Sequence, residues 1–320
     1  MFARTHLPSA SMRDALATTT SLRLRIEQGE AKAWLLSAFI EDEALVLGRF
    51  QRAQDTLFDA TLPHLVRQTG GPAWRASKGA LYVALLLSSR DAITPTPSGK
   101  LMNRNLRGLI QMGRALGAPF VYGGRELLSV AGQAIGLVSQ VTTLAGAVVI
   151  ECLIGVEASV LPHADQVDDA WIGTRWPMPW SSLKERGLAT SQDAIVDALT
   201  ASHEAWIGAA LSLQESYCNH VEFMSNEDEA GLVWSRCIGV PAGLVTVGVD
   251  ATRLRVRGDV MQDEAADALL WTAWSETRDP SEALRLAYPE GIAGVPMPAL
   301  AELIAEAVLV MKAAGSTLAK

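Results

Sequence analysis

The chain has 320 residues, of which 49% are hydrophobic and 19% are charged, so it can bury a substantial core in one large domain or two. A formal net charge of −8 argues against a general affinity for nucleic acid or anionic membranes. Three widely spaced cysteines form neither a disulfide framework nor a zinc spacing, and the first residues lack the pattern of a signal peptide. We therefore expect a cytoplasmic protein.

The N-terminal third is predicted to be mostly strand. Residues 1–22 are expected to form a polar lead-in, with at most a short helix over Ser11–Ala17. Short apolar runs beside acidic residues favour strands over Ala33–Ile40 and Ala44–Arg49. The run Leu81–Ser88 is consistent with a buried strand, although its leucine and alanine content leaves a helix open.

The next segments alternate between a helix and a hairpin. The spacing of leucines over Asn103–Leu116 predicts an amphipathic helix with its arginines on the solvated face. Two β-branched segments, Leu127–Gln140 and Ala145–Val160, are typical of a hairpin. The apolar stretch Leu144–Val156 is too short for a membrane span and contains Glu151. Cys152 within it is expected to be a buried core thiol.

A polar string follows, in which His163, Asp165, Asp168 and Asp169 have a spacing that a metal could use. Aspartates in a loop beside prolines are more often solvated or cap helices, so no metal site is predicted. The segment Thr190–Leu213 then has the pattern of a long helix.

The last third is predicted to be a separate small domain. The charge-rich stretch Ser225–Gly231 is typical of a boundary. Beyond it the sequence predicts three strands and two helices. The strands are expected at Leu232–Ile238, Gly243–Val249 and Arg253–Arg257, and the helices at Asp263–Ser275 and Pro298–Ala314.

Two adjacent glycines follow an arginine in the stretch Arg67-Gln68-Thr69-Gly70-Gly71. Glycine pairs let backbone amides point at an anion, and the Arg67 guanidinium is a permanently charged fork for phosphate or carboxylate. A tight turn between two elements explains the same pair without any ligand. Both interpretations stay open at this point.

Continued through Pro72 and Ala73, this stretch resembles without a gap a Thr/Ser-Gly-Gly segment of the lipoate–protein ligase and octanoyltransferase family, whose catalytic module biotin–protein ligases share. Upstream, the residues Val46-Leu47-Gly48-Arg49-Phe50-Gln51 resemble the family's strand that ends in a Gly-Arg-x-Gln turn. Downstream, Gly124–Leu127 and Val130–Gly136 resemble the strand pair that carries the catalytic lysine. The resemblance implies a substrate- or cofactor-binding site made of Arg67, Thr69, Gly70, Gly71, Ala73, Arg125, Gly132, Gln133 and Gly136.

The departures from this pattern affect its chemistry. The family's lysine falls at Gln133 or Ala134, so no catalytic residue is assigned. Ala76-Ser77 replaces a His-Asp pair, and Pro72 has no N–H to offer a phosphate.

We therefore expect an α+β protein in which a mixed-sheet biotin/lipoate-ligase-like catalytic module, residues 1–225, precedes a small α/β accessory domain, residues 226–320. The resemblance implies binding of a small carboxylic acid or its adenylate for acyl transfer to a carrier or amine. ATP is then the implied cofactor, the use of Mg²⁺ stays open, and nothing is bound covalently. The alternative is an inactive pseudoenzyme that acts as a binding partner or subunit. Implied partners are a lipoyl-type carrier protein or a partner subunit, and neither nucleic acid nor membrane.

Overall fold

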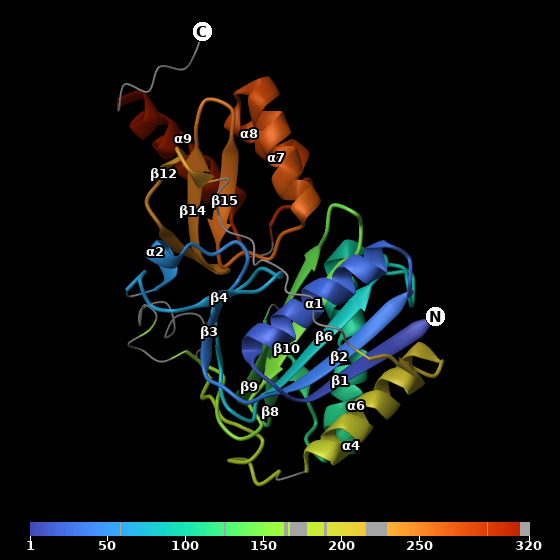
Figure 1. Cartoon of the computed structure of the whole chain (residues 1–320). Coiled ribbons are helices and arrows are strands. Elements are labelled where there is room, and N and C mark those ends of the chain that lie inside the picture. The colour runs from blue at the N-terminus through green and yellow to red at the C-terminus, as the bar shows by residue number, and fades with distance from the viewer. Residues whose placement is uncertain are drawn as a thin grey trace.

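The computed structural model describes residues 1–313 except 58, 125, 163–165, 167–177, 189–190, 216–228 and 293. A large mixed sheet with helices on both faces is joined to a smaller sheet that has its own helices (Figure 1). The predicted α+β class is confirmed.

The helices and strands follow one another along the chain with these bounds: β1 Phe2–Ala10, α1 Met12–Glu27, β2 Ala33–Ile40, β3 Ala44–Leu47, α2 Ala53–Thr56, β4 Leu65–Val66, β5 Trp74–Ala76, β6 Leu81–Leu87, η1 Ser98–Lys100, α3 Leu101–Asn105, α4 Arg107–Ala115, β7 Val121–Tyr122, β8 Leu127–Val130, β9 Gln133–Thr142, β10 Val148–Ile154, α6 Gln192–Ile207, β11 Ser212–Leu213, β12 Val233–Trp234, β13 Ile238–Val240, β14 Gly243–Val249, β15 Leu254–Gly258, α7 Glu264–Thr277, α8 Pro280–Ala287 and α9 Met297–Ala313.

The large sheet has the strand order β11-β1-β2-β6-β10-β9-β8-β7. β1 runs parallel to its neighbours β2 and β11, and the remaining pairs are antiparallel. Every residue of β2, β6 and β10 is buried, because helices cover both faces of the sheet. This burial explains why these strands have continuous apolar sequences, and it confirms the strands predicted at Ala33–Ile40 and Leu81–Ser88.

The two faces of the large sheet have different covers. Helix α1 places Leu16 and Leu22 in the same core as Trp34 and Leu86. Helices α4 and α6 pack against each other on the opposite face, over a core that includes the buried thiol of Cys152 (Figure 1).

The polar lead-in predicted for residues 1–22 is wrong, since these residues form β1 and most of α1. β1 contains few large apolar residues, and its inward positions include the hydroxyl of Thr5, so no hydrophobic alternation is visible. Ser11 caps α1 by accepting a hydrogen bond from the Asp14 amide. The buried side of α1 contains Thr18 and Thr19, which hide its apolar period.

Several further elements differ from the sequence prediction. The helix predicted at Thr190–Leu213 ends at Ile207 and is followed by β11, and the strand predicted at Leu232–Ile238 is divided between β12 and β13. The segment Leu127–Gln140 divides into β8 and β9, because Ala131 and Gly132 adopt positive φ angles of 47° and 78° and reverse the chain. The predicted helix at Asn103–Leu116 divides into α3 and α4. Helix α8, with Asp279 as its cap and Pro280 in its first turn, was not predicted.

In the C-terminal part, β14 pairs with β12 and β13 and also with β15. Helices α7 and α8 pack together, and α9 lies against β14. The predicted domain boundary at residue 225 falls within 216–228, outside the described residues, and stays a prediction.

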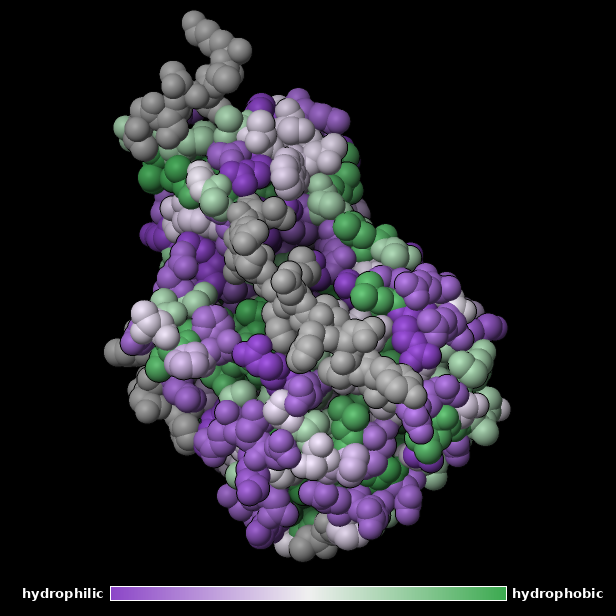
Figure 2. All heavy atoms as spheres, in the orientation of Figure 1, coloured by the Kyte–Doolittle hydropathy of each residue, from purple (hydrophilic) through white to green (hydrophobic). Residues whose placement is uncertain are grey.

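The described helices include none that is long and apolar enough to cross a membrane. On the face shown in Figure 2, hydrophobic residues lie in small separate groups among hydrophilic ones.

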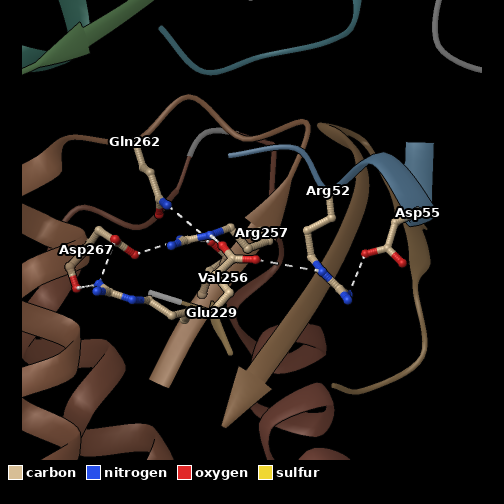
Figure 3. A network of polar contacts seen from close by, with 8 residues as sticks. Arg52, Asp55, Glu229, Val256, Arg257, Gln262 and Asp267 are labelled. Atoms are coloured by element: carbon tan, nitrogen blue, oxygen red, sulfur yellow. Dashed lines mark hydrogen bonds and ion pairs between the residues drawn. The ribbon is translucent and has the colours of Figure 1, made fainter. Parts of the chain in front are cut away.

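An ion-pair network links the C-terminal elements to the first part of the chain (Figure 3). On β15, Arg255 and Arg257 both bind the carboxylate of Asp267 on α7, at 2.8 and 3.0 Å. Arg257 also binds Glu229, which lies 3.9 Å from the Nε atom of Arg52, beside α2. Burial opposes the charge on Arg257, but the carboxylates of Asp267 and Glu229 outweigh it and raise the pKa of this guanidinium.

The packing of α6 against α4 makes stability depend on pH through His203. The ring is buried against Gly108, where an added Cβ would come within 2.6 Å of it. Burial lowers the pKa of His203 from 6.5 to about 4, against the hydrogen bond of its Nδ1 with the Leu199 carbonyl. Between these two pH values the unfolded chain binds a proton at His203 that the folded chain does not bind. The free energy of unfolding therefore falls as the pH falls.

We predict that His203 removes roughly 3 kcal/mol of unfolding free energy between pH 6.5 and pH 4, and little more below pH 4. In the variant His203→Leu this part of the pH dependence should disappear, because leucine does not titrate. Urea unfolding of both proteins at several pH values measures the difference. Parallel pH profiles for the two proteins would contradict the prediction.

Candidate functional site

The stretch Arg67–Gly71 forms a turn against the end of β3. The Arg67 amide donates to the Leu47 carbonyl at 3.0 Å, and the Arg49 amide donates to the Thr69 carbonyl at 2.9 Å. A Cβ atom on Gly48 would lie 2.3 Å from the Gly71 oxygen, so the two backbones touch directly. This close approach requires glycine at position 48.

Arg67 is 1% exposed, and its guanidinium is held by the protein itself. It donates to the Gly70 carbonyl, to the Thr69 hydroxyl at 3.2 Å and to the Ser139 hydroxyl at 3.3 Å. The guanidinium also lies 4.0 Å from the centre of the Trp74 ring. In this conformation Arg67 stabilises the turn to which it belongs.

A buried carboxylate lies beneath the turn. Glu151, in the middle of β10, is 0% exposed. It accepts hydrogen bonds from the Thr69 amide at 3.0 Å, from the Thr69 hydroxyl at 2.5 Å and from the Tyr82 hydroxyl at 2.6 Å. Burial and then the Glu151 carboxylate raise the pKa of Tyr82 far above its ordinary value, so the phenol stays protonated and donates.

The network continues across the sheet to helix α1. Ser139 lies opposite Glu151 in the β9–β10 register and shares a hydrogen bond with the Thr69 hydroxyl. The Tyr82 hydroxyl shares another with Thr19 at 2.8 Å. Sequence analysis missed this network, although a glutamate inside an apolar strand was a visible signal that polar partners must be near.

The glycine pair is covered by the C-terminal elements. The Gly71 amide donates to the Val260 carbonyl at 2.9 Å, and a Cβ on Gly70 would lie 2.2 Å from the same oxygen. Because this carbonyl occupies the Gly71 amide, the amide is not directed at an anion in this conformation. Ala73, the next predicted site residue, is fully buried beside Trp74.

The second set of predicted residues lies at the start of β9. Gly132 is in the exposed turn before it, and a Cβ added to Gly136 would lie 2.7 Å from the Leu153 carbonyl oxygen of β10. The buried Oε1 atom of Gln133 has no hydrogen-bond partner among the described residues.

Ala134 is 0% exposed. Its amide donates to the Pro179 carbonyl, and its carbonyl accepts from the Ser181 amide, both at 2.9 Å.

The structure brings the turn against the middle of β9 and not against its start. Arg67 reaches Ser139. Ala134 precedes Ser139 by five positions, roughly 16 Å at about 3.3 Å per residue. Arg125 lies outside the described residues, as do His163, Asp165, Asp168 and Asp169. The described residues contain no group of metal-binding side chains.

A pocket of about 250 Å³ lies behind the turn, next to the C-terminal elements. The Arg52 guanidinium stacks 3.7 Å from the centre of the Trp234 ring at this pocket. The residues that line it are Leu47, Gln51, Arg52, Ala53, Gln54, His64, Val66, Glu229 and Trp234. None of the predicted site residues is among them.

The arrangement of the large sheet, the glycine turn and the C-terminal elements is the fold of lipoate–protein ligases, as the resemblance predicted. LipL1 of Plasmodium falciparum, solved in complex with lipoate, superimposes with a TM-score of 0.61 over 95% of this chain and 98% of its own, at 9% identity.

Two further solved structures are similar. A bipartite lipoate–protein ligase from Thermoplasma acidophilum, studied with its E2 lipoyl domain, has a TM-score of 0.54 and 15% identity, over 67% of this chain and 87% of its own. A lipoate–protein ligase A bound with ATP has a TM-score of 0.52 and 15% identity, over 67% and 89%. No family model and no curated sequence matches the chain. These likenesses establish the fold.

The contact between the glycine turn and Val260 predicts a large effect of one methyl group. Gly70→Ala should lower the unfolding free energy by about 2 kcal/mol or more, because the new Cβ overlaps the Val260 carbonyl oxygen, which is part of the backbone. Gly239→Ala is the matched control, since an added Cβ there meets nothing within 4 Å. Urea unfolding measures both, and equal losses would show that the turn is not tightly covered.

The buried carboxylate of Glu151 predicts that two tyrosine-to-phenylalanine substitutions lower the free energy of unfolding by different amounts. Tyr82→Phe removes a donor to charged Glu151 and should cost about 1.5–3 kcal/mol. Tyr288→Phe removes a bond from the Tyr288 hydroxyl to the neutral amide of Gln262 and should cost about 0.5–1.5 kcal/mol. Each variant loses one buried hydroxyl, so thermal unfolding compares them directly. A Tyr288→Phe loss as large as that of Tyr82→Phe would contradict the importance of the carboxylate.

Proposed function

We propose that this protein binds a small carboxylic acid of the lipoate or octanoate class and acts together with a lipoyl-type carrier or a partner subunit. We propose further that the isolated chain does not carry out ATP-dependent acyl transfer. The fold supports the binding part, because similar proteins have been solved with lipoate and with ATP and one was studied with its lipoyl domain.

The observation that carries the proposal is the state of Ala134. The family resemblance puts a lysine at this position or at Gln133. Ala134 is fully buried, and both of its backbone groups are bonded to the segment Pro179–Ser181. A preorganised cation that stabilises developing negative charge is commonly the largest single contribution to such catalysis, and this strand offers none.

Other departures act in the same direction. Ala76 and Ser77 supply no His-Asp pair, Pro72 has no amide proton, and Arg67 is engaged by its own turn. Each lost transition-state contact typically costs about ten- to a thousand-fold in rate, although such losses do not add.

One observation favours a second candidate, an active acyltransferase whose cation comes from another segment. The segment that pairs with Ala134 continues to Lys184, whose amide donates to the Val156 carbonyl at 2.9 Å. The Lys184 ammonium binds the Glu157 carboxylate at 2.7 Å, and Glu157 packs against Gly79. In this candidate Lys184 would hold the acyl or phosphate oxygen, with ATP as co-substrate and the use of Mg²⁺ open. Arg125 is a further candidate for the same task.

The deciding experiment incubates the full chain with a lipoyl carrier domain, ATP, Mg²⁺ and either lipoate or octanoate, and then weighs the carrier by mass spectrometry. We expect no mass gain above that of a reaction without protein. Titration calorimetry with lipoate, octanoate, biotin and ATP tests binding separately, and we expect heat of binding for at least one carboxylic acid.

A stoichiometric mass gain would overturn the proposal and support the second candidate. Lys184→Ala should then abolish the gain, whereas Lys32→Ala, at another exposed lysine, should leave it unchanged. Absence of any carboxylic-acid binding would overturn the binding part independently of turnover.

A further inference from the structure

In one segment of this acidic chain, all the charged residues are basic. Between Asp91 and Glu126 there is no acidic residue, although the whole chain has a net charge of −8. The segment contains Lys100, Arg104, Arg107, Arg114 and Arg125. The first four lie at the end of η1 and on helices α3 and α4.

These four cations lie on the solvent-facing side of the segment. Lys100 ends η1, Arg104 lies on α3, and Arg107 and Arg114, seven positions apart, lie on one side of α4. Lys100, Arg107 and Arg114 are exposed and Arg104 is half-buried. The opposite side carries Leu106, Leu109 and Met112 into the core. We call the group of Lys100, Arg104, Arg107 and Arg114 the cationic stripe.

Nothing in the described part of the chain neutralises the stripe. No ion pair or side-chain hydrogen bond within the described residues involves any of its four cations. Several arginines elsewhere are paired, such as Arg49 with Glu264 and Arg255 with Asp267. Helix α6 packs against α4 and carries Asp193, Asp197 and Glu204, but none of these carboxylates forms an ion pair with the stripe. Like charges at such spacings repel one another, so the folded chain alone gains nothing from this arrangement.

The stripe also lies close in sequence to the predicted site. Helix α4 ends at Ala115, and the chain then forms β7, the last strand of the large sheet. β7 pairs with β8, and β8 leads through the Ala131-Gly132 turn to Gln133 and Ala134. The chain therefore leads from the stripe to the edge strand of the sheet and from there to the predicted site.

We propose that the cationic stripe is the docking surface for a small acidic protein domain of the lipoyl-carrier type. The identity of this partner rests on the proposed function, while the stripe itself does not. A protein face fits better than nucleic acid, because the stripe has no exposed aromatic side chain for stacking and the rest of the chain repels an extended polyanion. Complementary charge would accelerate encounter and set the orientation of the partner.

The test compares two triple variants of the full chain with the same net charge. Arg104→Gln, Arg107→Gln and Arg114→Gln together remove most of the stripe. Lys32→Gln, Arg285→Gln and Lys312→Gln together are the matched control on exposed cations elsewhere. The probe is a fluorescently labelled E2-type lipoyl domain with net negative charge, titrated at 50 mM and 300 mM NaCl.

We expect the stripe variant to bind the lipoyl domain at least tenfold more weakly at low salt, and the control less than twofold more weakly. Binding of the parent protein should weaken strongly with salt, and the stripe variant should lose most of that dependence. Equal binding by the parent and the stripe variant, or no binding by the parent, overturns the proposal. Tighter stripe-dependent binding of single-stranded DNA or anionic vesicles overturns the choice of a protein partner.

Carboxylic-acid binding, measured by calorimetry on the same variants, should not change. This separates the two proposals, since the acid-binding function can fail while the stripe still binds an acidic domain, and the reverse also holds.

Discussion

The hydrogen bonds between Glu151 and Thr69 fix the geometry on which the rest of the structure depends. A carboxylate at the centre of a sheet is costly to bury unless donors surround it. Thr69 supplies both its amide and its hydroxyl, and Tyr82 supplies a phenol. The turn is thereby fastened to three central strands, and Arg67 holds the turn in one shape. The shape of the turn determines where Gly48 and Val260 pack against it.

The C-terminal elements are attached to this turn by backbone contact and by charge. Val260 accepts from Gly71, and Phe50 accepts from the Gly258 amide at 2.6 Å. Glu264, at the start of α7, binds Arg49 and lies 3.8 Å from Arg23 on α1. These partly buried pairs need both partners, because removing one leaves an uncompensated charge. The same contacts that hold the C-terminal elements also occupy a glycine amide that could otherwise face an anion.

Features that depend on residues close together in the sequence could be predicted, and contacts between distant segments could not. The strand Ala33–Ile40 was correct to the residue, because a strand covered on both faces has a continuous apolar run. The Glu151 network was not predictable in detail, since its donors Thr69 and Tyr82 come from other segments. β1 was missed because it buries Thr5 and few large apolar side chains. The glycine turn was found by its residues, but its contact with Val260 joins distant parts of the chain.

The distribution of cations in this protein matches binding better than turnover. A cation stabilises a transition state most when it is fixed beside the reacting atoms in a site without water, where the effective dielectric constant is low. The strand that would hold such a cation carries Ala134, and buried Arg67 is committed to its turn. The unpaired cations described above lie instead on exposed helices, where water screens them and their field acts over about 10 Å to attract and orient a charged partner. On the proposed function, the chain has cations that can attract a charged partner, namely the cationic stripe. The cation that would drive acyl transfer is absent from β9.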